Sequence, residues 1–159
     1  MIKRLLLILS LVFLVSFSLN AQDVKQPAVA LIPYPVTLVE GEGAFVFTEK
    51  TVVSLEDKEM EAIARDFIGL FTKAAGFTPK LKVNNKKGEV RLMKDDSLQE
   101  EGYVLEVTSE KILMRAASVK GAFYALQTLR QLLPSAIESN ECNPDVVWEV
   151  PAIRVIDEP

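Results

Sequence analysis

Adjacent carboxylates are the residues in this sequence whose types and spacing could support general acid and base chemistry. Three such pairs occur, Asp95-Asp96, Glu100-Glu101 and Asp157-Glu158. A general acid and a general base must both reach one substrate, whereas neighbouring side chains on a strand point to opposite faces of the sheet. We therefore interpret the first two pairs as solvated turns, which is where charged side chains usually lie.

Other catalytic chemistries are limited by what the chain lacks. The sequence of 159 residues contains no histidine, and Cys142 is its only cysteine. Ser-His-Asp and Cys-His nucleophile systems, histidine metal sites and thiolate metal sites are therefore excluded. The glycine-rich stretch 41–43 carries Glu42 where a bound phosphate would lie, which disfavours phosphate binding. The sequence thus assigns no catalytic, cofactor-binding or metal-ligating residue.

Aromatic side chains and net charge bear on possible ligands. The side chains of Tyr34, Tyr103, Tyr124 and Trp148 could stack on sugar faces, but they are scattered, and packing in a core or interface is the favoured interpretation. The formal net charge of −4 and the lack of a basic stripe argue against a nucleic-acid partner.

The first 21 residues have the organisation of a secretory signal. Lys3 and Arg4 precede an apolar run, 5–19, that is shorter than the about 20 residues of a membrane span and ends in Leu19-Asn20-Ala21. We predict cleavage after Ala21, leaving no stable membrane span, and export to the periplasm or outer surface of a Gram-negative bacterium. An uncleaved anchor stays open, because Leu19 is larger than the residue a signal peptidase prefers there.

Hydrophobic periodicity predicts the α+β class for the rest of the chain, with strands, a helix, more strands and a second helix in that order. Two hairpins are expected, and the last strand is expected to be interrupted by Pro151. The expected strands are 36–39 and 44–48, joined by a turn at 40–43, then 51–55, 79–83, 89–93, 102–108, 111–117 and 146–156; the expected helices are 57–75 and 118–134.

The helix expected at Ser118–Pro134 has two uncharged faces. Its core stripe comprises Val119, Ala122, Phe123, Leu126, Leu129 and Leu133, and its opposite face comprises Gly121, Tyr124, Ala125, Thr128, Gln131 and Leu132. A helix without charge all round is usually covered on both sides. The helix at 57–75 carries charges on its outer face, so we predict that something beyond the sheet packs on 118–134.

Four motifs in order resemble the N-terminal domain of family 20 glycoside hydrolases, the β-N-acetylhexosaminidases. They are LIPYP at 31–35, EGYVL at 101–105, ASVKGAFYALQTLRQL at 117–132 and VPAIRVID at 150–157. The third is the most specific, and together they cover essentially the whole mature chain. The family is therefore the leading interpretation of the sequence.

The resemblance implies a mixed β-sheet with two helices packed on one face, preceding a (β/α)8 barrel that holds the active site. The family hydrolyses terminal N-acetylglucosamine or N-acetylgalactosamine by a substrate-assisted route. The family's catalytic Asp-Glu pair and substrate-binding arginine have no counterparts in this sequence. Asp157-Glu158 is not that catalytic pair, because it matches the domain junction of the family. The implied organisation is a signal at 1–21, the α+β domain at 22–156 and the start of a junction at 157–159.

The resulting hypothesis is a noncatalytic accessory domain of an exported β-N-acetylhexosaminidase, inactive alone and meeting glycan only through the absent barrel. Gly121, Tyr124, Thr128 and Gln131 are predicted to form the face on which that barrel docks, so that a lysine at Thr128 would leave the isolated domain stable. The alternative is a free-standing periplasmic module that binds a protein or a glycan.

Overall fold

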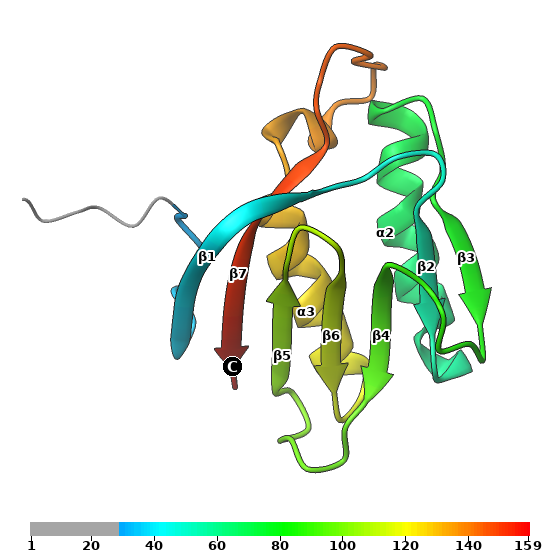
Figure 1. Ribbon diagram of the computed structural model, residues 1–159. Helices are drawn as coiled ribbons and strands as arrows, with labels where there is room; N and C mark the ends of the chain where they lie inside the picture. The colour runs from blue at the N-terminus through cyan, green and yellow to red at the C-terminus, as the bar shows by residue number, and fades with distance from the viewer. Residues whose placement is uncertain (1–28) are drawn as a thin grey trace, which may run out of the picture.

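The computed structural model describes residues 29–159, which form one seven-stranded mixed sheet with two helices on one face (Figure 1). The signal predicted at 1–21 lies outside the described residues. The strands are β1 (Thr37–Val46), β2 (Val52–Leu55), β3 (Lys80–Val83), β4 (Val90–Lys94), β5 (Tyr103–Val107), β6 (Ile112–Ala116) and β7 (Glu149–Asp157). The helices are α2 (Glu61–Ala74) and α3 (Val119–Leu132), with short 3-10 turns η1 (Lys58–Met60) and η2 (Ser135–Glu138). The predicted α+β class is confirmed.

The order of strands in the sheet is β1-β7-β5-β6-β4-β2-β3. Pairing is antiparallel from β1 through β7 and β5 to β6, and parallel from β6 through β4 and β2 to β3. The predicted hairpin at 102–117 is confirmed as β5 and β6. The helices lie behind the sheet in Figure 1, so within residues 29–159 no helix covers the face of the sheet turned to the viewer, which we call the open face.

The predicted hairpin at 36–48 is wrong, because these residues form the single edge strand β1, paired with β7. Between Glu40 and Ala44 the register shifts, so the glycine-rich stretch is a bulge in one strand. A Cβ on Gly41 would lie 3.2 Å from the Cβ of Ala152, and Gly43 has φ +88°. The glycines therefore serve a close approach and a left-handed backbone in the middle of the strand.

The predicted break at Pro151 is also wrong, since β7 continues through it. Pro151 pairs with Ala44 on β1, at the end of the bulge. It precedes Ile153, which is the first residue of β7 that pairs with β5. A proline lacks the N–H that a strand with two neighbours needs and is tolerated at bulges. Its position therefore spares the ladder between β7 and β5.

The polar segment 84–89 is a crossover and not a simple turn. It joins the parallel strands β3 and β4, which lie on either side of β2. A Cβ on Gly88 would lie 2.7 Å from the carbonyl oxygen of Val52, so the segment passes directly over β2. This segment explains why Ser54 on β2 is 1% exposed although it lies on the open face.

The core lies between the sheet and the two helices. Its centre is an aromatic cluster around Phe71, which has its ring centroid 4.7 Å from that of Phe47 and 6.0 Å from that of Trp148. Trp148 and Tyr103 are buried, as the preference for packing predicted, whereas Tyr34 is exposed. Among residues 29–159, no helix has the length and apolar character that a membrane span requires.

Candidate domain-docking surface

Helix α3 begins where the sequence predicts. The Ser118 hydroxyl oxygen accepts hydrogen bonds from the backbone N–H of Lys120 (3.0 Å) and Gly121 (3.4 Å), as an N-cap does. The same hydroxyl donates to the carbonyl oxygen of Glu100 at 2.6 Å. The cap therefore ties the start of α3 to the segment that leads into β5.

Gly121 lies on the side of α3 that approaches this leading segment. A Cβ at this position would lie less than 3.0 Å from the carbonyl oxygen of Gly102 and 3.3 Å from the Cβ of Ala116. Two backbones of this domain approach closely here, which a residue without a Cβ permits.

Thr128 lies further along the same side and is 7% exposed. Its hydroxyl lies 2.7 Å from the Tyr103 hydroxyl at the start of β5, and either group could donate. Burial raises the pKa of the Tyr103 hydroxyl, and the bond to Thr128 opposes that rise. A lysine at Thr128 would break this buried pair, so we now expect Thr128→Lys to destabilise the isolated domain, opposite to the expectation from the sequence.

We predict that Thr128→Val destabilises the chain by about 1–2 kcal/mol, because it leaves the Tyr103 hydroxyl buried without a partner. Adding Tyr103→Phe to Thr128→Val removes both polar groups and should recover much of the loss. Urea denaturation of the two single variants and the double variant measures the coupling. Strictly additive losses would show that the two hydroxyls do not support each other.

Gln131, the last residue of the predicted docking face, holds the N-terminal segment of the described chain. Its side-chain amide accepts from the backbone N–H of Ile32 (3.0 Å) and donates to the Ile32 carbonyl oxygen (3.1 Å). Leu31 beside it is 5% exposed and belongs to the core. The proline-containing segment at 31–35 therefore lies against α3.

These contacts change the composition of the predicted docking face. Gly121 and Thr128 are buried within the domain, Gln131 is bonded to Ile32, and Tyr124 is half-buried. Much of the uncharged face is thus covered by residues of this chain that are distant in sequence. Docking of a second domain there stays a prediction, and only Tyr124 and Gln131 of the four residues have surface to offer it.

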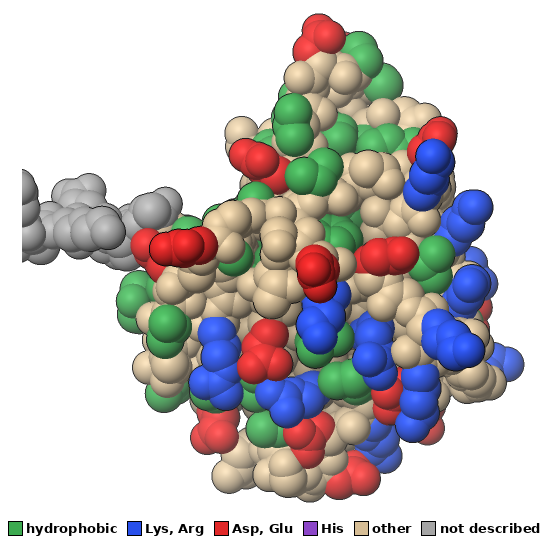
Figure 2. All heavy atoms as spheres, in the orientation of Figure 1, with side chains coloured by type: hydrophobic (Ala, Val, Ile, Leu, Met, Phe, Trp, Pro, Cys, Tyr) green, Lys and Arg blue, Asp and Glu red, His purple; other side chains and the backbone are tan. Residues whose placement is uncertain are grey.

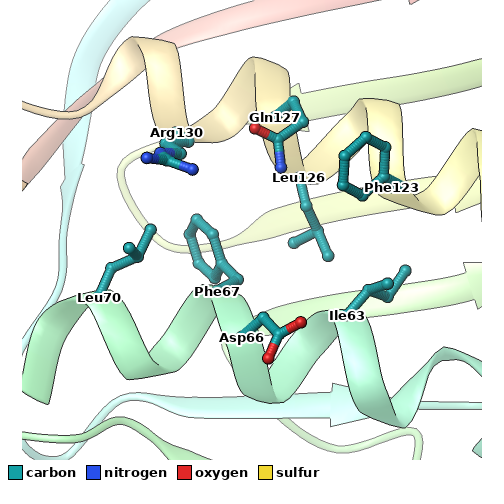
Figure 3. Close-up of a pocket in the computed structure, with 8 residues that line it drawn as sticks. All are labelled: Ile63, Asp66, Phe67, Leu70, Phe123, Leu126, Gln127 and Arg130. Carbon is teal, nitrogen blue, oxygen red and sulfur yellow. The ribbon is translucent and has the colours of Figure 1, made fainter. Parts of the chain in front are cut away.

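The side of α3 that faces α2 presents a second apolar surface. A groove of about 170 Å³ runs between the two helices and is lined mainly by apolar side chains (Figure 3). Phe123, predicted to be in the core, is instead 43% exposed at this groove. The other lining residues are Ile63, Asp66, Phe67, Leu70, Leu126, Gln127 and Arg130. We call this surface the interhelical groove.

The three carboxylate pairs do not form a shared pocket. The Asp95 carboxylate accepts from the hydroxyl (2.5 Å) and backbone N–H (3.1 Å) of Ser97, and these bonds lower the pKa of Asp95. Glu100 and Glu101 both reach Lys120 and raise the pKa of its amine, Glu100 more strongly. Both pairs lie between β4 and β5, and the prediction that they occupy turns is confirmed.

The third pair lies at the end of β7. The Asp157 carboxylate accepts from the backbone N–H of Val36 at 3.1 Å, which joins the end of β7 to the residue before β1. Across residues 29–159, no group of three His, Cys, Asp or Glu side chains is arranged to hold a metal ion. Among the three pairs in the described residues, only Glu100 and Glu101 have carboxylates that converge, and they converge on Lys120.

The sheet, the two helices on one face and the interhelical groove define a small α+β domain. The family model described as glycosyl hydrolase family 20, domain 2, matches residues 28–158. The chain belongs to this family, which confirms the resemblance drawn from the four sequence motifs.

Individual relatives agree with the family match. The chain is 29% identical over 157 residues to a β-hexosaminidase of Porphyromonas gingivalis, covering 94% of this chain and 20% of that protein. Its fold matches a β-hexosaminidase of Streptomyces plicatus with TM-score 0.76 and 26% identity, covering 84% of this chain and 27% of that one. A GH20 β-N-acetylhexosaminidase of Streptomyces coelicolor gives TM-score 0.72 and 27% identity, covering 79% and 25%.

The chain therefore spans about a fifth of the length of the curated relative and about a quarter of these solved relatives. In the homologues this domain precedes a larger catalytic region of the full enzyme. The sequence interpretation of residues 157–159 as the start of a junction stays a prediction.

Proposed function

We propose that this chain is the noncatalytic N-terminal accessory domain of an exported β-N-acetylhexosaminidase that hydrolyses terminal N-acetylhexosamine residues in glycans. The observation that carries the proposal is the match of domain 2 of the family to residues 28–158, in a chain that spans 20% of its Porphyromonas relative. On this proposal the chain is inactive alone, and the residues that hydrolyse the glycan belong to a (β/α)8 catalytic domain.

The catalytic domain is proposed to dock on the outer side of α3, over Tyr124 and the interhelical groove. The groove is lined largely by apolar side chains, and Phe123 is 43% exposed beside it. An exposed aromatic next to an apolar groove is typical of a surface that becomes buried in an assembly. The open face of the sheet is proposed to stay in contact with solvent. Glu106 on this face pairs with Arg115 and Arg154, and charged side chains of this kind usually lie on solvated surfaces.

The test compares the purified chain with the product of the coding DNA read past codon 159. We expect the chain to leave a chromogenic N-acetyl-β-glucosaminide intact and the longer product to hydrolyse it. Turnover that stays with the purified chain, or a reading frame that stops at codon 159, would contradict the proposal. Mass spectrometry of the secreted product should begin after Ala21 if export follows the predicted signal.

Docking is tested in the longer product with Phe123→Ser. We expect a lower melting temperature for the longer product and little change for the chain alone, because the side chain of Phe123 is already partly exposed in the chain. Val147→Ser is the matched control, since Val147 is another large apolar residue, 60% exposed, in the loop before β7. Equal effects of Phe123→Ser on both proteins would place the docking surface elsewhere.

A further inference from the structure

Positive charge is concentrated in one segment of a chain that is acidic as a whole. Residues 73–94 contain seven Lys and Arg and a single Glu, although the formal net charge of the chain is −4. The basic residues of this segment are Lys73, Lys80, Lys82, Lys86, Lys87, Arg91 and Lys94. Figure 2 shows Lys and Arg gathered on the right of the molecule, where Figure 1 has β3 and β4.

The basic surface follows the edge strand β3. Lys80 and Lys82 are exposed, whereas Leu81 and Val83 between and beside them pack against the core. Side chains two apart on a strand share a face and stand about 7 Å apart along it. The two lysines therefore form the start of a row on the open face of the sheet, at an edge that no other strand of residues 29–159 covers.

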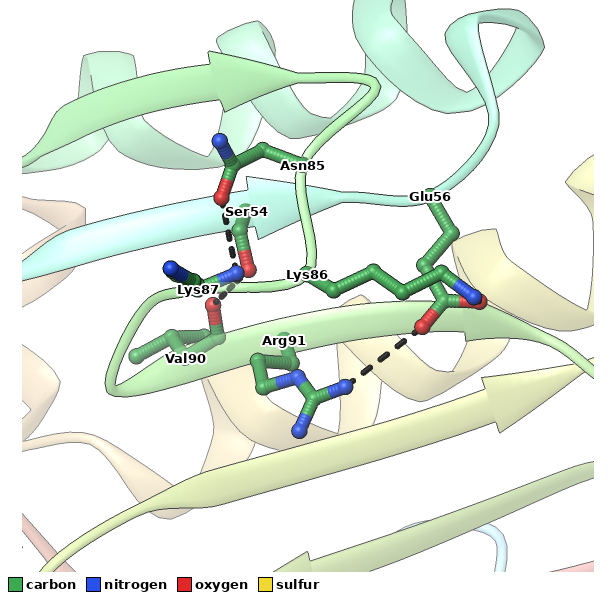
Figure 4. A network of polar contacts seen from close by, with 7 residues as sticks. All are labelled: Ser54, Glu56, Asn85, Lys86, Lys87, Val90 and Arg91. Atoms are coloured by element: carbon green, nitrogen blue, oxygen red, sulfur yellow. Dashed lines mark hydrogen bonds and ion pairs between the residues drawn. The ribbon is translucent and has the colours of Figure 1, made fainter.

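The crossover segment brings further positive charge onto the same face. It carries Lys86 and Lys87 over β2, next to Arg91 on β4 (Figure 4). A hollow of about 480 Å³ lies here, and its lining includes Lys82, Lys87 and Lys111. The carboxylates of Glu89 and Glu110 also line it.

The acidic residues around the hollow leave part of this charge unbalanced. Glu56 pairs with Arg91 (3.5 Å) and Lys86 (3.9 Å), and the Glu89 carboxylate accepts from the backbone N–H of Val52 (2.9 Å). In the described part of the chain, the amines of Lys80, Lys82 and Lys87 have no carboxylate within ion-pair distance. We call Lys80, Lys82, Lys86, Lys87 and Arg91 the basic edge.

We propose that the basic edge binds an acidic glycan, a polysaccharide that carries repeated sulfate or carboxylate groups. A row of ammonium groups along a strand and its neighbouring loop suits a polysaccharide with repeated anionic groups. On binding, the lysines replace the cations that accompany these anionic groups in solution. The choice of a glycan as the anion rests on the proposed function. The inference adds acidic glycans to the proposed function as a class of substrate. The accessory domain would hold such a glycan beside the catalytic domain.

Two other polyanions fit the surface less well. None of the exposed large hydrophobic residues falls within 73–94, whereas proteins that lie on membranes usually insert apolar side chains beside their basic residues. Single-stranded nucleic acids are usually held by aromatic side chains that stack on bases, and the only aromatic residue in this segment is Phe77, which packs on Phe71 in the core. The described surface therefore favours a soluble acidic polysaccharide.

The experiment measures binding of the purified chain to heparin, a sulfated probe, and to hyaluronan, which carries carboxylates only. The variant Lys82→Gln/Lys87→Gln should weaken heparin binding roughly 3- to 10-fold at low salt, since each exposed ion pair contributes modestly. It should also flatten the salt dependence of binding. Lys58→Gln/Lys120→Gln is the matched control, because it removes the same charge from exposed lysines outside residues 73–94 and should stay within twofold of the wild type.

Loss of heparin binding in the variant at 82 and 87 with retention in the control would support the basic edge, and hyaluronan binding then tells whether carboxylates suffice. Equal loss in both variants, or no heparin binding at low salt, would overturn it. Tighter binding to phosphatidylglycerol vesicles or to an oligonucleotide than to either glycan would also overturn it. Hydrolysis of the chromogenic substrate by the longer product does not involve heparin. The test of the proposed function is therefore independent of the test of the basic edge.

Discussion

Gly121→Ala is expected to destabilise the chain by about 3 kcal/mol, at the upper end of what overpacking costs. The added methyl group would lie less than 3.0 Å from the carbonyl oxygen of Gly102, which is backbone and cannot turn aside as a side chain can. Relief requires α3 to move away from β5, which would strain the Ser118 cap and the pair of Tyr103 and Thr128. Thermal denaturation should show a melting temperature lower by roughly 10 °C.

Gly69→Ala on α2 is the matched control for this prediction. Both glycines lie within helices, but a Cβ on Gly69 would meet nothing within 4 Å. Alanine favours a helix over glycine by about 1 kcal/mol, so Gly69→Ala should stabilise the chain slightly. If both substitutions stabilise it, the close approach of α3 and the segment before β5 does not constrain Gly121.

The local elements of this fold could be predicted from the sequence, because their signals lie within a few residues. Ser118 and the apolar periodicity after it gave the start of α3, and the alternation in 102–117 gave the β5 and β6 hairpin. The motif around 117–132 further indicated the family, which the match to residues 28–158 confirms.

Contacts between distant segments could not be predicted from the same signals. A glycine-rich stretch such as 40–43 is compatible with a turn or a bulge, and only its pairing with β7, more than 100 residues away, decides between them. The same limitation applies to 84–89, because the polar composition of a segment between two strands does not tell a turn from a crossover over β2.

What covers the candidate docking face within the chain could not be predicted, for a related reason. Periodicity shows which residues share a side of α3, but not what covers that side. Gly121 and Thr128 are covered by β5 and the segment before it, and Gln131 holds Ile32, which lies 99 residues earlier. Phe123 was placed in the core because it is apolar, yet it lies at the edge of the apolar stripe and is exposed at the interhelical groove.

Phe71→Ala is expected to have the largest effect on stability, a loss of about 3–5 kcal/mol. Phe71 is fully buried and joins α2 to the rest of the core, with its ring centroid 4.7 Å from that of Phe47, 5.8 Å from those of Phe67 and Phe77, and 6.0 Å from that of Trp148. Alanine would remove the common partner of four aromatic rings that come from different segments. Such a cavity cannot close by the movement of one side chain, so most of the loss should persist.

Trp148 makes this effect directly observable, because it is the only tryptophan in the chain and lies against Phe71. Urea denaturation followed by tryptophan fluorescence should show a lower midpoint for Phe71→Ala with a nearly unchanged slope. Phe71→Leu, which keeps most of the volume, is the control and should lose less than half as much. A loss below about 1 kcal/mol for Phe71→Ala would mean that the sheet and α2 are held together mainly by contacts elsewhere in the core.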